Sequence, residues 1–318
     1  MQIFNPDSKV PFLSMRKPAI AVVILLVIGS LFMIFGKGLN YGLDFTGGVL
    51  VEVAYEKPID TGDVRKALAE ADFGGAMVQS VGGTRDVVVR LQPKDMASGE
   101  DSGKQADRVA EQVLAALKAS RGDVSLKRHD FVGPQIGAQL RNDGIVAVVF
   151  VTIGIMLYLA IRFERRFAVA VLITEIHDTI VTVGIIALVG REFDMTVLAS
   201  VLAVIGYSVN DTVVVFDRVR ELFRLSRKAD PETILNRAIN NTLSRTIITS
   251  LTTAITMGAL YLWGGPAVKG FAVTMLIGIG LGTLSSIFIA CPLLLWLGVS
   301  KQDLMPVKKD NPELARRP

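Results

Sequence analysis

The sequence predicts an α-helical membrane bundle of six transmembrane helices, with one α+β domain of the ferredoxin-like type inserted between helices 1 and 2. Three observations support this fold class. Of the 318 residues, 51% are hydrophobic and only 20% are charged, a lower share of charge than soluble domains carry. Six apolar runs each approach the ~20 residues needed to cross a bilayer. A charge-rich segment separates the first run from the second.

The apolar runs set the expected membrane helices. The first run, residues 18–35, follows Arg16 and Lys17, as in a signal peptide. No small-x-small cleavage site follows it, so we expect a retained helix. The remaining runs lie at residues 144–161, 167–189, 195–216, 246–263 and 271–297. The last run is the longest and contains Pro292, so we expect this helix to tilt or bend near its end.

The segment 36–142 alternates between strand and helix patterns. Its expected strands are residues 49–55, 76–81, 86–91 and 124–131, and its expected helices are residues 61–71 and 104–119. Gly82 and Gly83 supply a turn between the two middle strands, and Pro93–Gly103 is a polar loop. The order strand–helix–strand–strand–helix–strand is that of the split βαβ, or ferredoxin-like, domain.

Basic residues indicate the orientation in the membrane. They gather at one set of helix ends: Lys9, Arg16, Lys17, Arg162, Arg165, Arg166, Arg218, Arg220, Arg224, Arg227, Lys228, Arg237, Arg245, Lys301, Lys308, Lys309, Arg316 and Arg317. The opposite short loops hold only Arg191 and Lys269. Because basic loops stay in the cytoplasm, we expect a multi-pass protein with both termini (1–17 and 299–318) cytoplasmic. Domain 36–142 then faces outward, and helices 2–6 occupy 143–298.

The cytoplasmic loop between helices 4 and 5, residues 218–245, contains a helix signal. Asp230 and Pro231 are typical of an N-cap and a first helical position. An apolar face then follows, formed by Ile234, Leu235, Ala238 and Ile239. We expect an amphipathic helix that lies along the inner leaflet or under the bundle.

Composition excludes several classes of function. The single cysteine, Cys291, permits no intrachain disulfide or thiolate metal cluster, and two histidines make a histidine-built metal site improbable. The chain has a net charge of +4, but its basic residues flank membrane helices, which disfavours nucleic-acid binding. No phosphate-binding G-x-x-x-x-G-K-[ST] motif occurs. We therefore expect no metal, no cofactor and no catalytic residues, with energy supplied by a partner or an ion gradient.

Ionisable residues within the apolar runs are the candidate functional residues. Each costs roughly 2.5–3.5 kcal/mol at a helix centre, so each needs a reason. Helix 3 carries Glu175, His177 and Asp178, and helix 4 carries Asp211. Buried carboxylates that gain and lose a proton can form a proton pathway. For His177 we expect an interhelical hydrogen bond, and for the Asp217–Arg218 dipeptide an interfacial ion pair.

Other polar residues have a structural alternative. Asn210, Ser244 and a hydroxyl stripe (Thr249, Thr252, Thr253 and Thr256) are expected to form hydrogen bonds between helices. Arg245 lies near the cytoplasmic boundary, so it is either an anchor at the membrane surface or part of the proton pathway. In helix 6, glycines at positions 278, 280 and 282 provide a small surface for close approach of another helix.

Three motifs resemble the SecD/SecF family, in order and with matching topology. They are YGLDFTGG at 41–48, GYSVNDTVVVFDR at 206–218 and NTLSRTIITS at 241–250. The glycine-rich turn at 264–272 also fits. The resemblance covers essentially the whole chain and implies the architecture of the resistance-nodulation-division superfamily.

The resemblance also implies a function. Such a chain would sit in the bacterial cell inner membrane, with domain 36–142 in the periplasm. It would form a heterodimer with SecD, associate with the SecYEG channel and YajC, and use the proton-motive force to promote translocation of a preprotein. In this family, a helix-4 aspartate and a helix-5 arginine are linked to proton passage, and these positions correspond to Asp211 and Arg245.

The remaining motif residues are expected to serve structure or coupling. Asn210 and Asn241 belong to the second and third motifs. In the first motif, Asp44, Gly47 and Gly48 form either a simple turn into the first strand or a coupling element between helix 1 and the domain. Both interpretations stay open at this point.

Three alternative functions compete with protein export. A proton-coupled exporter of small molecules or lipids shares the architecture but usually has larger outer domains and two six-helix halves. A scaffold that only stabilises a partner is the second. An intramembrane enzyme is the third, but the segment Glu175–Asp178 lacks the H-E-x-x-H spacing of a zinc protease.

Overall fold

The computed structural model describes residues 10–80, 83–92, 102–226 and 230–300. The chain divides into two compact units. The helical unit comprises Met1–Leu39, Phe150–Arg191 and Thr196–Pro318, and the α+β unit comprises Asn40–Val149 and Glu192–Met195. The short segment Glu192–Met195, which lies between two membrane helices in the sequence, therefore belongs to the α+β unit.

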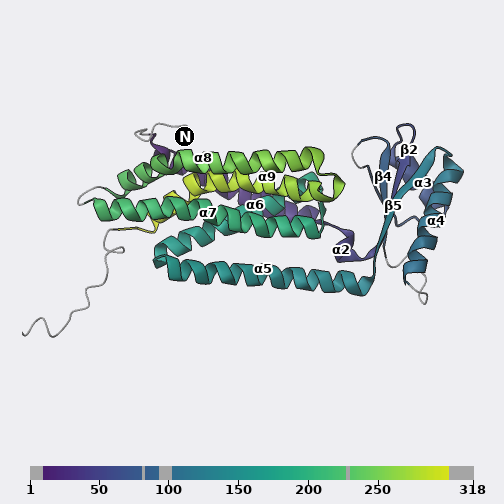
Figure 1. The fold of residues 1–318 in the computed structure, drawn as a ribbon, viewed down its shortest axis with the longest axis horizontal. Helices are drawn as coiled ribbons and strands as arrows, with labels where there is room; N and C mark the ends of the chain where they lie inside the picture. The colour runs from purple at the N-terminus through teal and green to yellow at the C-terminus, as the bar shows by residue number, and fades with distance from the viewer. Residues whose placement is uncertain (1–9, 81–82, 93–101, 227–229, 301–318) are drawn as a thin grey trace, which may run out of the picture. The chain divides into compact units, whose positions relative to one another are not determined.

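Six helices in the described part of the chain are long and apolar enough to cross a membrane (Figure 1). The first combines a 3-10 turn, η1 (Phe12–Met15), with α1 (Arg16–Phe32) and a π-helical turn, η2 (Met33–Lys37). The next four are α5 (Pro134–Arg162), α6 (Arg165–Val189), α7 (Met195–Leu225) and α8 (Pro231–Trp263). The sixth combines α9 (Pro266–Ser285), a second π-helical turn, η4 (Ser286–Ala290), and α10 (Cys291–Trp296). The prediction of six long apolar helices is confirmed.

The helix predicted to begin at Asp230 and Pro231 is present, but it is the first part of helix 5 and not an element of the loop. Asp230 does cap a helix, because its carboxylate accepts a hydrogen bond from the Glu232 backbone (3.1 Å), and Pro231 is the first helical residue. The helix then continues without a break into the membrane span, since no glycine or proline interrupts it before Gly258. Its first apolar residues, including Leu235, are buried in the core instead of lying on a leaflet.

The irregularity predicted near Pro292 appears just before it, as the η4 turn. A proline inside a helix lacks an N–H and its ring clashes with the carbonyl four residues earlier. Here that carbonyl belongs to Phe288, in the middle of η4. A π-helical turn, which often interrupts an α-helix at a functional or strained position, allows the helix to continue from α9 into α10.

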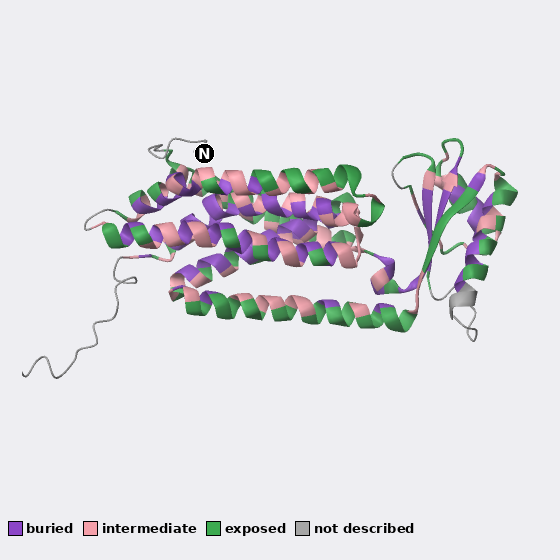
Figure 2. Cartoon of the chain, in the orientation of Figure 1, coloured by how far each residue is buried: buried purple, intermediate pink, exposed green. Residues whose placement is uncertain are grey.

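The helical unit packs around its most buried spans, α6, α7 and α9. Figure 2 shows many buried residues on these helices and mostly exposed or intermediate residues on α5. At one end of the core, the rings of Phe167 and Phe216 lie 5.3 Å apart and nearly perpendicular. The α1–α6 crossing is close: a Cβ on Gly184 would lie 2.2 Å from the Cβ of Ser30, so only glycine fits there.

The N-terminal segment is bound to the start of α8 by two asparagines. Asn240 accepts a hydrogen bond from the backbone N–H of Val10 (3.1 Å) and donates to its carbonyl oxygen (3.0 Å). Asn236 accepts from the backbone of Leu13 (3.0 Å). The Leu13 side chain is fully buried in the same core as Leu235.

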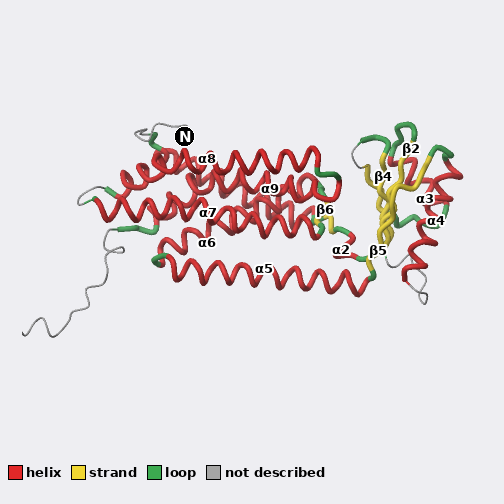
Figure 3. Tube along the Cα trace, in the orientation of Figure 1, coloured by secondary structure: helices red, strands yellow, loops and turns green. Residues whose placement is uncertain are grey.

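The described part of the α+β unit contains a four-stranded antiparallel sheet, drawn in yellow in Figure 3. Its elements are β2 (Gly48–Tyr55), α3 (Thr61–Glu70), β3 (Met77–Ser80), β4 (Asp86–Leu91), α4 (Ser102–Ser120) and β5 (Val124–Val132). The strand order β3-β4-β2-β5 is that of a split βαβ topology. These six elements match the predicted ones to within two residues. Gly82 and most of the Pro93–Gly103 loop lie outside the described residues.

Side chains alternate between the two faces of the sheet along each strand, and this alternation decides which residues form the core of the α+β unit. In β2, Val49, Val51 and Val53 are fully buried beneath α3 and α4, because successive side chains point to opposite faces of a sheet. The intervening Glu52 lies on the other face, where it accepts a hydrogen bond from Arg128 (2.7 Å). A second, two-stranded sheet pairs β1 (Asn40–Tyr41) with β6 (Glu192–Phe193) in parallel.

Candidate functional site

The first buried polar centre surrounds Asp178, in the middle of α6. Its side chain is fully buried. One carboxylate oxygen accepts hydrogen bonds from Ser208 of α7 and Ser285 of α9, each at 2.6 Å. The other oxygen lies 2.9 Å from Nδ1 of His177. Three helices therefore converge on one carboxylate.

Glycines of α9 permit this convergence. A Cβ on Gly278 would lie 2.1 Å from Val204, and one on Gly282 would lie 3.2 Å from Ser208. Both glycines thus face α7 of the same chain, whereas Gly280 has nothing within 4 Å of the position of a Cβ. Small residues let helices approach closely, and here the approach brings the two serines to Asp178.

Two further polar atoms next to this centre are buried. Glu175 and His177 are each 6% exposed. In the part of the chain that the structure describes, Glu175 Oε1 and His177 Nε2 have no hydrogen-bond partner. Among these residues, the hydrogen-bond partner of His177 is Asp178, the next residue of the same helix, and not a residue of another helix as expected. Unsatisfied buried polar atoms are costly, so a further polar partner would stabilise this centre.

The second centre surrounds Asp211, on α7. Asp211 is 2% exposed and accepts a hydrogen bond from Ser250 of α8 (3.4 Å). The Ser250 hydroxyl lies 2.6 Å from that of Thr283 on α9 and 3.5 Å from that of Tyr207 on α7. The carboxylate is thus linked to a chain of hydroxyl groups contributed by three helices.

Arg245 does not contact Asp211 directly. Among the described residues, no ion pair of 4 Å or less joins their side chains, and Arg245 is exposed on the surface of α8. Asn210, the residue before Asp211, is exposed as well. Asn241 lies one turn before Arg245; with its amide nitrogen facing the Arg237 carbonyl, it accepts two hydrogen bonds from Arg218 of α7 (2.7 and 3.1 Å).

The hydrogen bonds of the predicted hydroxyl stripe lie within α8 and do not join helices. Thr249, Thr252, Thr253 and Thr256 each donate to a backbone carbonyl four residues earlier in α8, at 2.9–3.1 Å. Such bonds are the common alternative for a threonine inside a helix. Ser250, which was not singled out in the sequence, makes the contacts between helices instead.

The ion pair predicted between Asp217 and Arg218 is also not the one formed. Asp217 accepts two hydrogen bonds from Arg162, at the end of α5 (2.6 and 2.7 Å). Arg218 pairs with Glu221, one turn further along α7 (2.6 Å). Neighbouring residues in a helix point about 100° apart, so each reaches a different partner.

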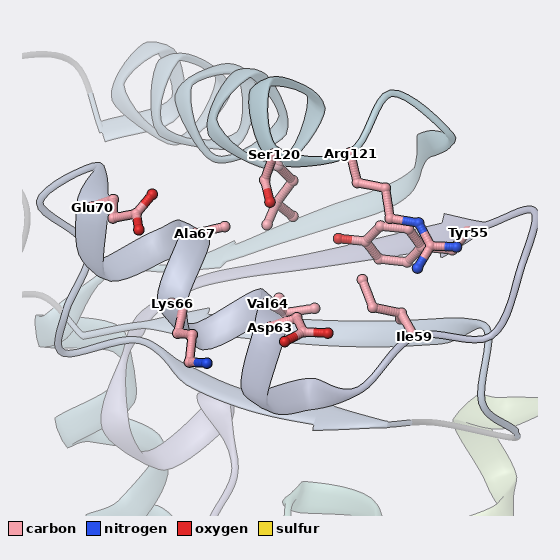
Figure 4. A pocket seen from close by; sticks show the side chains of 10 residues that line it. Tyr55, Ile59, Asp63, Val64, Lys66, Ala67, Glu70, Ser120 and Arg121 are labelled. Carbon is pink, nitrogen blue, oxygen red and sulfur yellow. The ribbon is translucent and has the colours of Figure 1, made fainter.

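A pocket of about 340 Å³ lies in the α+β unit, on the side of the sheet that the helices cover. Figure 4 shows Arg121 beside the ring of Tyr55, with its guanidinium carbon 5.8 Å from the ring centroid. Burial raises the pKa of Tyr55 to about 12, although Arg121 opposes this rise. The other lining residues are Ile59, Asp63, Val64, Lys66, Ala67, Glu70, Leu117 and Ser120, an apolar floor with charges of both signs around it.

The residues that sequence reasoning missed are hydroxyls: Ser208, Ser250, Thr283 and Ser285. Ser208 could have been found, because it lies one helical turn before Asp211 and shares its face. Nothing in the sequence distinguishes Ser250 from its threonine neighbours, since its role depends on which side of α8 faces α7 and α9.

Comparison with known protein families identifies the chain. Residues 112–300 match the family described as "Protein export membrane protein SecD/SecF, C-terminal", and residues 32–59 match "SecD/SecF GG Motif". The chain belongs to the SecD/SecF family. The membership predicted from the three sequence motifs is therefore confirmed, and the first motif, at 41–48, falls within the second match.

Full-length relatives in this family carry the name protein translocase subunit SecF. The relative from Vibrio alginolyticus is 42% identical over 320 residues, covering 100% of this chain and 99% of the relative. The relative from Pseudomonas aeruginosa is 43% identical over 295 residues, covering 93% of this chain and 94% of the relative.

Solved structures of SecDF share the fold. The crystal structure of SecDF, a translocon-associated membrane protein, from Thermus thermophilus is 34% identical, with a TM-score of 0.80 over 92% of this chain. SecDF in a super-membrane-facing form has a TM-score of 0.66 over 91% of this chain, again at 34% identity. This chain spans only 39% of either SecDF chain.

Proposed function

We propose that this chain is an accessory subunit of the Sec protein-export translocase. With a SecD partner, it uses the proton-motive force to promote preprotein translocation across the bacterial inner membrane. The observation that carries the proposal is the second buried centre: a nearly inaccessible carboxylate, Asp211, connected to hydroxyls of three membrane helices. Family membership and the relatives' shared name support the link to protein translocation.

The Asp211 centre can convert proton movement into a change of helix packing. An ionised carboxylate among apolar groups is stabilised by its hydrogen-bond donors and by nearby positive charge. Protonation removes that charge, so the hydrogen bond of Ser250 with Thr283 then becomes more favourable than its hydrogen bond with Asp211. Moving one charge through the membrane potential supplies about 2.3 kcal/mol per 100 mV, which is enough to shift a two-state equilibrium by more than tenfold.

Arg245 lies at a depth that suits a role beside Asp211. At 1.5 Å per residue, Asp211 is about 24 Å along α7 from Met195, and Arg245 is about 27 Å along α8 from Trp263. Both of these helix ends face the periplasm in the proposed topology. Asp178 and Glu175 form the second part of the pathway, because Ser208, one turn from Asp211, donates to Asp178 (2.6 Å).

A SecD bundle would cover the polar face that this chain leaves open. Arg245 and Asn210 are exposed on helices that cross the membrane, where lipid chains offer no hydrogen-bond partners. A second six-helix bundle against α7 and α8 would satisfy both groups. The glycine face of α9 is less suited to this interface, because Gly278 and Gly282 already face α7. SecYEG and YajC would be further partners.

The α+β unit would face the periplasm and contact the emerging polypeptide. The distribution of basic residues supports this orientation. The pocket lined by Tyr55 and Arg121, with its apolar floor and mixed charges, suits contacts with many different sequences. Both termini would lie in the cytoplasm.

The direct test is the Asp211→Asn variant. Asparagine keeps the size and can still accept from Ser250, so the complex should assemble. It cannot exchange a proton, so export should lose its dependence on the proton gradient. The measurement is the export rate into inner-membrane vesicles with and without a gradient, at equal amounts of each variant.

A matched control is available six residues further along α7. Asp217→Asn changes the same residue type about two turns before the end of α7, where the side chain is 39% exposed, and should retain gradient-dependent export. Arg245→Lys, which keeps the charge but loses the planar fork, should give a partial loss. If Asp211→Asn exports at the parental rate and still responds to the gradient, the proposed function of this carboxylate is wrong.

A further inference from the structure

Asp44 lies at the start of α7, although 151 residues separate it from that helix in the sequence. Its carboxylate accepts a hydrogen bond from the backbone N–H of Met195 (2.9 Å), and both residues belong to the α+β unit. The first N–H groups of a helix have no partner within the helix, and a negative charge there is stabilised by the helix dipole. Asp44 therefore acts as a helix cap supplied by a distant part of the chain.

The backbone around Asp44 also forms hydrogen bonds with the residues that precede α7. β1 pairs with β6, and the N–H of Gly42 donates to the carbonyl of Phe193 (2.8 Å). A Cβ on Gly42 would lie 2.9 Å from both the Asp194 Cβ and the Glu192 carboxylate. Position 42 must be glycine for β1 to approach the residues just before α7 this closely.

The two glycines after Asp44 hold the start of α5 in the same way. Gly47 and Gly48 have φ angles of +67° and +123°, which residues with side chains rarely adopt. A Cβ on Gly48 would lie 2.1 Å from the Leu91 carbonyl oxygen, and one on Gly137 of α5 would lie 2.8 Å from the Gly47 nitrogen. The motif therefore packs against the end of β4 and the first turn of α5.

An ion pair connects the four-stranded sheet to the residues that precede α7. Arg90 of β4 is 9% exposed and pairs with Glu192 of β6. Burial raises the pKa of Glu192, while Arg90 opposes the rise. Next to this pair, the rings of Phe45 and Phe193 lie 6.0 Å apart. Polar and aromatic contacts thus join the sheet and the motif to the three residues that precede α7.

We propose that Asp44 is a positioning residue: it holds the first turn of α7 on the α+β unit, and the continuous helix α7 links that turn to Asp211. The 41–48 motif is then a clamp, defined by Tyr41–Gly48 and its contacts with Glu192–Met195. Since α7 is continuous, displacement of the α+β unit would be passed along α7 to the buried carboxylate. This role deepens the proposed function and rests on it.

The clamp can be tested without any export assay. In the purified full-length chain, Asp44→Ala should increase hydrogen–deuterium exchange of the peptide that begins at Met195 by about fivefold, the size expected for a lost helix cap. Asp44→Asn keeps an oxygen acceptor and should restore the parental exchange. Asp60→Ala is the matched control, because Asp60 caps α3 through the Gly62 N–H (2.7 Å) and should leave the Met195 peptide unchanged.

The positioning role is tested by export. Asp44→Ala should lose most of the gradient-dependent part of export at equal protein levels, whereas Asp44→Asn and Asp60→Ala should retain it. Unchanged exchange in Asp44→Ala would overturn the clamp. Faster exchange with parental gradient-dependent export, or an equal loss in Asp60→Ala, would overturn the positioning role. Failure of the proposed function is separate: it would appear as gradient-dependent export in Asp211→Asn, whatever the exchange result.

Discussion

At the scale of single residues, serine hydroxyl groups donate hydrogen bonds to both buried aspartates of the helical unit. Asp178 receives two serine hydroxyls at 2.6 Å, and Asp211 receives one at 3.4 Å. The shorter and more numerous bonds make Asp178 the better anchored of the two. The weaker bond at Asp211 can be exchanged for the Ser250–Thr283 contact at 2.6 Å with little displacement, which suits a group that changes protonation.

A buried phenol outside the membrane provides a pH-dependent prediction. The pKa of Tyr55 is raised to about 12 by burial, against about 10 in an unfolded chain. Between these values the unfolded chain loses the phenolic proton and the folded chain keeps it. The free energy of unfolding should therefore fall as pH rises above about 10. Tyr55→Phe should remove this part of the pH dependence, as measured by chemical denaturation at pH 8–11.

Absorbance titration checks the same residue directly. The difference in phenolate absorbance between the parent and Tyr55→Phe should show a midpoint near pH 12. A midpoint near 10 would mean that the Tyr55 hydroxyl is solvated, in contradiction to its 4% exposure in the structure.

At the scale of helices and strands, close packing depends on which glycines face a neighbour. Along α9, Gly278 and Gly282 face α7, whereas Gly280 has open space where a side chain would begin. Two positions four residues apart lie on the same side of a helix. A position two residues away from either of them lies on the opposite side. The three glycines identified together in the sequence therefore have different roles.

Alanine substitutions should separate these roles. Gly278→Ala would place a Cβ 2.1 Å from Val204 and should destabilise the chain by about 1–3 kcal/mol, the usual cost of overpacking. Gly280→Ala should be neutral or slightly stabilising, since alanine favours helix over glycine by about 1 kcal/mol. Thermal unfolding in detergent measures both. Equal effects of the two substitutions would contradict the α7–α9 packing.

At the scale of the whole molecule, the chain is one helical bundle with an inserted α+β unit, and the distribution of basic residues predicts its orientation in the membrane. The basic ends of α5, α7 and α8 agree with a cytoplasmic location for all three. The buried carboxylates lie on helices of one bundle, while their exposed neighbours Asn210 and Arg245 face outward. The molecule is therefore suited to work as part of a larger membrane complex.

Cysteine labelling in intact cells tests the orientation. Gly74→Cys, at an exposed position of the α+β unit, should react with a membrane-impermeant maleimide from outside. Leu225→Cys, at the end of α7 and 72% exposed, should react only after the inner face is opened. The parent is the control, because its one cysteine, Cys291, is buried. The opposite labelling pattern would overturn the proposed topology.

The sequence by itself determined the number of membrane helices, the order of elements in the α+β unit and the family. These features depend on local signals: the length of an apolar run, the period of alternation, and motifs read along the chain. The sequence also identified Asp178 and Asp211, because a carboxylate within an apolar run is costly wherever its partners lie.

Only the tertiary structure decided which side chains meet. Ser250 contacts the neighbouring helices, and its threonine neighbours do not, because it lies on the side of α8 that faces α7 and α9. Asp217 pairs with Arg162 and not with the next residue, Arg218. Asp44 caps a helix that begins 151 residues later. Contacts of this kind depend on how helices and strands pack across long sequence separations, and the pattern of neighbouring residues carries no information about them.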